Sequence, residues 1–123
     1  MLPKIVKAAS LKEVWTSERC FIYENYGVTT AGDETISIAR ARVEPDVTTK
    51  AHHLEGVKEI YLIVKGKGRV TVGELRDVDV SEGDVVVIPE GVTQKIQNTG
   101  KTDLVFYCIC TPSFDKKVYR EDE

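Results

Sequence analysis

The sequence has no apolar run that approaches the ~20 residues a helix needs to cross a bilayer. Lysine and arginine do not cluster, and the net charge of −3 argues against nucleic acid as a partner. Residues 1–8 include two lysines but lack the apolar block of a signal peptide. We therefore expect a cytoplasmic protein that interacts with neither nucleic acid nor a membrane.

Cysteine and histidine are also scarce. The three cysteines, Cys20, Cys108 and Cys110, are an odd number without a secretory signal, so they do not predict a disulfide framework. Cys108 and Cys110 lie two apart in an apolar run, which favours buried thiols that pack as small hydrophobic side chains. The two histidines, His52 and His53, are consecutive, so a regular strand would turn only one of them into a barrel.

The composition that is present fits one small domain. With 123 residues, 41% hydrophobic and 30% charged, the chain is long enough for one hydrophobic core and too short for two. We predict a single domain over residues 1–123, with its core at about 20–112, an N-terminal arm at 1–19 and a C-terminal tail at 113–123. The tail is expected to be solvated and partly disordered at its end.

Signals for short strands dominate the chain. Period-two alternation and β-branched runs recur, separated by turn residues such as glycine and proline. The predicted strands lie at 20–23, 35–43, 59–64, 68–72, 78–80, 85–88, 94–97 and 104–110. Because antiparallel strands this short need closure or stacking to protect their edges, the sequence predicts an all-β sandwich or barrel.

Two segments resemble the two motifs of the cupin superfamily. Residues 46–66 resemble the first motif, G(X)5HXH(X)3,4E(X)6G, and residues 83–98 resemble the second, G(X)5PXG(X)2H(X)3N, with Gln94 in place of the histidine. The resemblance implies a double-stranded β-helix, the jelly-roll cupin barrel, with a pocket lined by His52, Glu59 and Gln94. Within the superfamily the pattern is similar to small single-domain cupins described as mannose-6-phosphate isomerase-like.

The first motif can be aligned in two registers. In the first, His52 and Leu54 occupy the two histidine positions of the motif, and four residues precede Glu59. In the second, His53 and Glu55 occupy those positions, and three residues precede Glu59. We favour the first register because it turns the apolar Leu54 into the barrel and leaves the polar His53 and Glu55 outside.

The family resemblance also implies a metal site, for which cupins use Mn, Fe, Ni, Co or Zn. The candidate metal ligands here are His52, Glu59 and Gln94, and an amide oxygen such as that of Gln94 is a weak donor for these metals. Two alternatives stay open. Either the pocket holds a divalent metal on these three side chains, or His52 forms a hydrogen bond with Glu59 and no metal binds.

Glu59 is the leading catalytic candidate, since a carboxylate that begins an otherwise apolar strand is costly to bury without a partner. It would act as a ligand or general base, with His52 as its acid–base partner. Gln94 is a candidate for substrate contacts. So is Tyr61, which shares the strand face of Glu59.

Two arginines are softer candidates for substrate binding. Arg40 and Arg42 alternate with Ala39, Ala41 and Val43. If the arginine face lined the pocket, a planar guanidinium would bind an anionic substrate. The alternative is an exposed polar face on a half-buried strand.

Together these features favour a protein that binds a small-molecule ligand, in one of two forms. The first is a metal-dependent enzyme that acts on a sugar, a sugar phosphate or a small oxygenated acid in an isomerase-like reaction. The second is a cupin barrel without chemistry that binds or senses its ligand. The family resemblance and the exposed strand edges also predict a homodimer.

Overall fold

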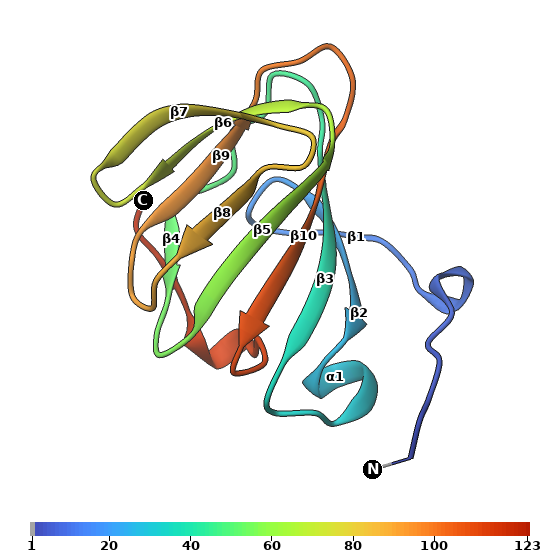
Figure 1. Ribbon diagram of the computed structural model, residues 1–123. Coiled ribbons are helices and arrows are strands. Elements are labelled where there is room, and N and C mark those ends of the chain that lie inside the picture. Colours follow the sequence, from blue (N-terminus) through green and yellow to red (C-terminus); the bar gives the residue numbers. More distant parts are fainter. Residues whose placement is uncertain (1) are drawn as a thin grey trace.

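The computed structural model describes residues 2–123, which form short strands in two antiparallel sheets (Figure 1). The strands are β1 (Val14–Trp15), β2 (Phe21–Tyr26), β3 (Ser37–Val43), β4 (His52–Leu54), β5 (Lys58–Lys65), β6 (Lys67–Val72), β7 (Leu75–Ser81), β8 (Val85–Ile88), β9 (Gln94–Asn98), β10 (Leu104–Thr111) and β11 (Tyr119–Glu121). The helices of the described residues are short: α1 (Val28–Ala31) and the 3₁₀ helices η1 (Ala8–Ser10) and η2 (Lys116–Val118). The prediction of an all-β fold is confirmed.

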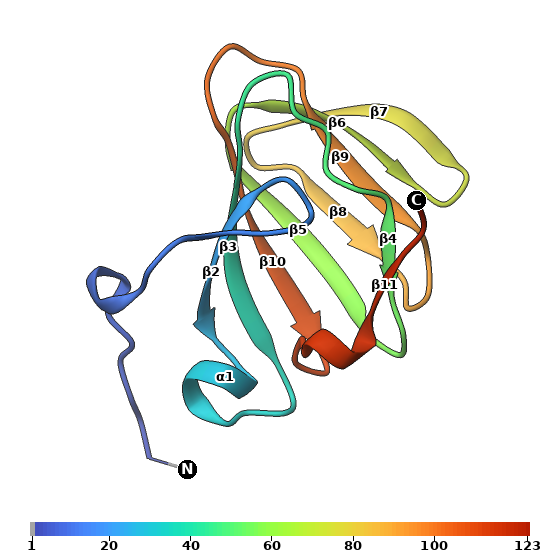
Figure 2. The same cartoon turned by 180° about the vertical axis from the view of Figure 1, so that it is seen from behind.

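Strands that follow one another along the chain mostly belong to different sheets. One sheet has the order β1-β2-β3-β10-β5-β8, and the other has the order β11-β4-β9-β6-β7. From β3 to β11 the chain changes sheet at every connection except β6 to β7, which is the pattern of a double-stranded β-helix. Figures 1 and 2 show the sheets wrapped around one interior, so the predicted jelly-roll barrel is confirmed.

The strands that the sequence predicted are all present, each within a few residues of its expected bounds. The strands that the sequence did not predict are β1, β4 and β11. Each of them is only two or three residues long, which is too short for an alternating pattern to show.

Alternation along β5 decides which of its side chains enter the barrel. Glu59, Tyr61 and Ile63 are buried, whereas Ile60 and Leu62 between them are half-buried on the outer face. Ile63 packs into the main hydrophobic core, which also contains residues of β3, β6, β9 and β10. Glu59 stands at the other end of the strand, where the interior turns polar.

Gly66 makes the tight turn that joins β5 to β6. Its φ of +92° lies in the left-handed region, and a Cβ added there would lie 2.9 Å from the carbonyl oxygen of Asp103. Only glycine accepts both the conformation and the close approach of the neighbouring backbone. The turn therefore depends on glycine at this position of the first motif.

The C-terminal segment is part of the barrel. β11 pairs with β4, and the side chains of Phe114, Val118 and Tyr119 pack against a buried cluster around Leu54. Figure 2 shows this segment, which we call the C-terminal strap (residues 114–122), running beside β4. The prediction of a solvated tail is therefore corrected for residues 114–119, because their apolar side chains gain burial by covering the barrel, whereas residues 120–123 are exposed as expected.

The N-terminal segment, by contrast, lies apart from the barrel until the chain reaches β1 (Figures 1 and 2). Leu2 and Ile5 are 85% and 83% exposed there. Within residues 2–123, no helix is long and apolar enough to cross a membrane.

Candidate functional site

A cavity of about 970 Å³ lies inside the barrel. Its walls come from β2, β3, β5 and β10 of one sheet, from β4 of the other, and from the C-terminal strap. Residues between 10 and 18, α1 and Thr49 complete the lining, so the cavity reaches from the barrel interior to the N-terminal segment. Most of its lining is small or apolar, as at Ala39, Ala41 and Phe106. The polar side chains that line its inner part include Glu18, His52, Glu59 and Tyr61, together with the buried hydroxyls of Ser37 and Thr49.

Glu59 is the most deeply buried acid of the cavity. Its side chain is held between strands, because Glu59 pairs with Cys110 of β10 and with Ile88 of β8. The Cys110 thiol donates to Oε2 at 3.6 Å, whereas Oε1 has no hydrogen-bond partner. Desolvation raises the pKa of Glu59 to about 7, against the opposing effect of the neighbouring Gln94 amide. The carboxyl group is therefore poised between its two protonation states.

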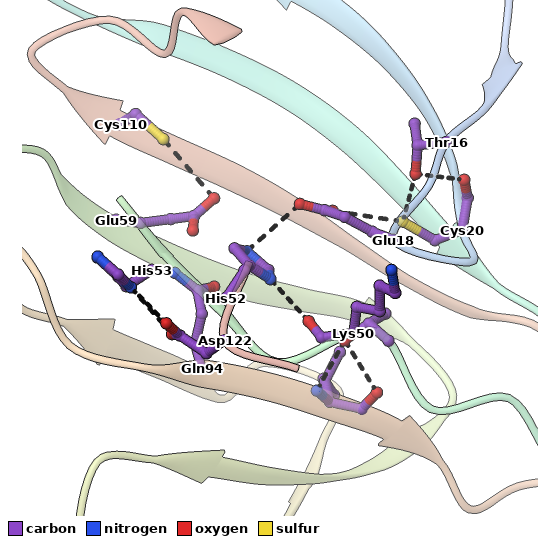
Figure 3. Close-up of polar contacts among 12 residues, drawn as sticks. Thr16, Glu18, Cys20, Lys50, His52, His53, Glu59, Gln94, Cys110 and Asp122 are labelled. Atoms are coloured by element: carbon purple, nitrogen blue, oxygen red, sulfur yellow. Dashed lines mark hydrogen bonds and ion pairs between the residues drawn. The ribbon is translucent and has the colours of Figure 1, made fainter. Parts of the chain in front are cut away.

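His52 faces Glu59 from β4. Its Nδ1 lies 2.8 Å from the carbonyl oxygen of Lys50, and an oxygen of that kind can only accept, so Nδ1 carries the proton. Nε2 then points into the cavity, 3.3 Å from Oε1 of Glu18 (Figure 3). On its other side the ring stacks on Tyr119, with centroids 4.9 Å apart. The backbone carbonyl, the carboxylate and the aromatic ring together fix the orientation of the imidazole.

Glu18 is a site residue that sequence reasoning missed. It belongs to the loop before β2, and burial raises the pKa of its carboxyl group, partly opposed by His52. Because Nδ1 of His52 holds its proton, a contact between Nε2 and Glu18 needs one further proton on either group. Glu18 and His52 therefore form an ion pair when the imidazole is protonated, with Nε2 and Oε1 3.3 Å apart. No motif or alternation marks Glu18, which lies in the segment expected to be an N-terminal arm.

Gln94 and Tyr61 are bonded to each other. The Tyr61 hydroxyl donates to Oε1 of Gln94, and the ring of Tyr61 packs on Phe106 at 4.5 Å between centroids. Nε2 of Gln94 is buried without a partner, and Figure 3 shows the amide pointing toward Glu59. Tyr61 lines the cavity, but Gln94 does not and lies behind Glu59.

The two motif registers are distinguished by which histidine enters the barrel. His52 and Leu54 are each 3% exposed and line the cavity. His53 lies on the outer side, where its Nδ1 is 2.8 Å from Asp122 of the C-terminal strap. This is the arrangement of the first register, in which an apolar side chain occupies the second histidine position.

The arginines of β3 lie on the outer face of the barrel. Arg42 bonds both carboxylate oxygens of Glu13, at 2.9 and 2.8 Å, and Nη1 donates to Asp103 at 3.0 Å. Arg40 lies 3.5 Å from the same Glu13 carboxylate. Ala39 and Ala41 line the cavity instead. The hypothesis that an arginine binds the substrate inside the barrel is corrected by this placement, which agrees with the alternative of a polar outer face.

The side chains at the motif positions do not fit a transition-metal site. Of the three candidate ligands, His52 directs Nε2 at Glu18, and Gln94 offers an amide oxygen that already accepts from Tyr61. Across residues 2–123, no three His, Cys, Asp or Glu side chains gather in a way that could hold a metal ion. Such metals bind three or four nitrogen, sulfur or carboxylate ligands. Glu59, His52 and Glu18 line the same cavity, but their donor atoms do not gather closely enough to form that set.

Comparison with protein families places residues 39–110 in the family described as cupin domain, Cupin_2. The matched segment covers more than half of the chain and includes both motifs. A curated relative is the oxalate-binding protein of Thermotoga maritima, which is 38% identical over 71 residues. That alignment covers 58% of this chain and 58% of the relative, so the chain spans less than two thirds of the relative's length.

Solved structures share the fold. A predicted oxalate decarboxylase from Thermotoga maritima superposes with a TM-score of 0.78 at 24% identity, covering 89% of this chain and 99% of that one. An oxalate decarboxylase from Bacillus subtilis, studied for its Mn(II) centres, superposes with a TM-score of 0.73 at 26% identity. It covers 85% of this chain, which spans 29% of that protein.

Proposed function

This chain belongs to the cupin domain family, and from that premise we propose that it binds an organic small molecule inside the barrel, against Glu59. The observation that carries the proposal is the unpartnered Oε1 of Glu59, on a side chain only 7% exposed. A buried polar atom without a partner costs free energy, and a donor on a ligand would recover it. The cavity of about 970 Å³ is at the upper end of the range typical for ligand pockets.

The relatives support this proposal at the level of class. One of them, 38% identical over 71 residues, is named for binding oxalate, a small organic molecule. The walls of the cavity add shape, since Tyr61 and Phe106 on one side and Tyr119 on the other present flat aromatic surfaces. A ligand between them would lie within reach of both Glu59 and His52.

A second candidate function is proton-transfer catalysis, such as the isomerisation of a sugar or a small oxygenated acid. It is favoured by the presence of two proton-transfer groups in one cavity, Glu59 and the His52–Glu18 pair. In such a reaction Glu59 would remove a proton from carbon, and the imidazole would supply one to oxygen. Solvent deuterium incorporation into a panel of aldoses, ketoses and hydroxy acids, followed by NMR, tests this candidate, and Glu59→Gln is expected to abolish any exchange.

Metal dependence is not part of the proposed function, because the donor set falls short of a metal site. Protein purified without chelator or affinity tag is expected to contain no stoichiometric Mn, Fe, Ni, Co or Zn. The metal content of wild type is compared with that of His52→Ala and His53→Ala, which shows whether any bound metal depends on the histidine inside the barrel. One metal per chain that is lost in His52→Ala and kept in His53→Ala would overturn this expectation.

The binding proposal is tested by a thermal-shift screen of a small-molecule library on the full chain. A ligand present at 100 times its Kd adds about 2.7 kcal/mol to the free energy of unfolding. Ala39→Phe fills the cavity, so hits that bind there should no longer shift its Tm. Ala8→Phe, at an exposed position outside the cavity, is the matched control. A screen without any hit that depends on Ala39 would contradict the proposal.

A further inference from the structure

The charges of the cavity set the kind of ligand that it accepts, an inference that rests on the proposed function. The acidic side chains that line it are Glu18, Glu24, Glu59 and Asp115. The lysines that line it, Lys12 and Lys116, are both exposed, at the rim. Among residues 2–123 no arginine lines it, and Arg40 and Arg42 lie outside, bound to Glu13.

The inner part of the cavity has no cation free to meet an anion. His52 is the one basic side chain among the inner lining residues. Its Nδ1 is bonded to the Lys50 carbonyl, and its Nε2 faces Glu18 at 3.3 Å. Any positive charge on the imidazole is therefore already balanced by a carboxylate of the same chain, and an anionic ligand would have to displace Glu18 to reach it.

Glu59 adds an acceptor that needs a donor. Oε1 has no hydrogen-bond partner, although the unpartnered Nε2 of Gln94 points toward the same carboxylate, and the group is more than nine-tenths buried. An N–H or O–H of a ligand would satisfy it. A ligand carboxylate would bring a like charge to the same buried place whenever Glu59 is ionised, so it would bind only against the protonated form.

The aromatic walls, at Tyr61, Phe106 and Tyr119, favour flat groups. One face of Tyr119 is covered by His52, and Tyr61 packs on Phe106. A ligand cation would therefore meet only the aromatic surface that these contacts leave open.

We propose that the cavity binds a neutral or cationic, flat organic molecule that donates hydrogen bonds to Glu59, and that it rejects oxalate and other dicarboxylates. This selectivity is the reverse of that suggested by the name of the Thermotoga maritima relative. The difference follows from the charged groups of this chain, which place carboxylates and no free cation around the ligand.

Three probes of nearly equal shape test the charge preference: benzamidine, benzamide and benzoate. Their binding to the full-length wild type is measured by calorimetry, alongside oxalate with and without Mn²⁺. We expect benzamidine to bind at least tenfold more tightly than benzoate, benzamide to lie between them, and oxalate to show no binding in either condition. Benzoate or oxalate binding as tightly as benzamidine would overturn the proposal.

Glu59→Gln keeps the size of the side chain and removes its negative charge. In this variant the preference for benzamidine over benzoate should fall at least tenfold, whereas Glu74→Gln, at an exposed position far from the cavity, should retain it. An unchanged preference in Glu59→Gln overturns the role of Glu59. The ranking on wild type stands as a test by itself if Glu59→Gln does not fold.

The failure of this inference differs from failure of the proposed function. If library hits bind in an Ala39-dependent way but all three probes fail or the anions bind best, the ligand class is wrong and the binding function stands. If no hit depends on Ala39, the binding function itself is wrong, and the charge preference falls with it.

Discussion

Replacing Glu59 by glutamine is expected to stabilise the protein at alkaline pH much more than at acidic pH. In the unfolded chain the carboxyl group titrates near 4.5, and burial raises the pKa to about 7 in the folded barrel. Folding therefore favours the protonated form. The contribution of Glu59 to stability is fully present below pH 4.5 and is lost as the pH rises through 7.

The magnitude follows from the size of the shift. At ~1.4 kcal/mol per unit, a change from 4.5 to about 7 corresponds to about 3 kcal/mol of folding free energy. Wild type should lose up to this amount relative to Glu59→Gln between pH 4.5 and pH 8. Groups distant from Glu59 titrate alike in both proteins, so their effects cancel in the difference, whereas Glu18 and His52 interact with the Glu59 charge and contribute to it.

Urea denaturation of both proteins at pH 5 and pH 8 measures this difference. Glu74→Gln makes the same chemical change at an exposed position and should give an equal difference from wild type at both pH values. If Glu59→Gln also gave the same difference at pH 5 and pH 8, the carboxyl group would not be desolvated as described. If wild type were the more stable protein at pH 8, a cation bound to Glu59 would be indicated, and the reasoning about the donor set would be refuted.

Three further predictions test other parts of the structure. Gly66→Ala should lower the free energy of unfolding by more than the ~1–2 kcal/mol that a left-handed residue costs, because its Cβ would meet the Asp103 carbonyl. Gly83→Ala, where φ is +89° and the space is open, should lower it by less. Equal losses in urea denaturation would contradict the close approach at Gly66. Arg42→Met should lower the free energy of unfolding by about 1 kcal/mol, because it removes the contacts to Glu13 and Asp103. Calorimetry should find the affinity for benzamidine unchanged in this variant. A weaker affinity would mean that Arg42 reaches the cavity. Val85 and Val87 are 56% and 55% exposed on the edge strand β8, so we expect this edge to pair two copies of the chain. Light scattering should report a homodimer that Val87→Lys dissociates and that Leu75→Lys, on β7, leaves intact. A monomeric wild type would argue against the dimer.

Much of the barrel could be predicted because its signals are local. Alternation placed Glu59, Tyr61 and Ile63 on one face of a strand, and β5 buries that face. Turn residues marked most strand ends, and the polarity of His53 against Leu54 indicated which register turns inward. These properties depend on neighbours within a few residues, so the sequence carries them directly.

The placement of the arginines shows where local signals stop. Alternation required Arg40 and Arg42 to share one face and Ala39 and Ala41 the other, but it did not say which face is inside. The position of β3 between β2 and β10 decides this, and Glu13 and Asp103 form ion pairs with Arg42 on the outer face. Both acids are distant in sequence from the strand.

The sequence by itself determined the strands, the turns and the family motifs, because each arises from residues close together along the chain. Only the tertiary structure brought Glu18 and Tyr119, 101 positions apart, to opposite sides of His52. The reason is physical: the loop before β2 and the C-terminal strap bury their side chains by closing over the barrel, and no periodicity marks such contacts. The charge of the cavity, and with it the ligand class, follows from that closure.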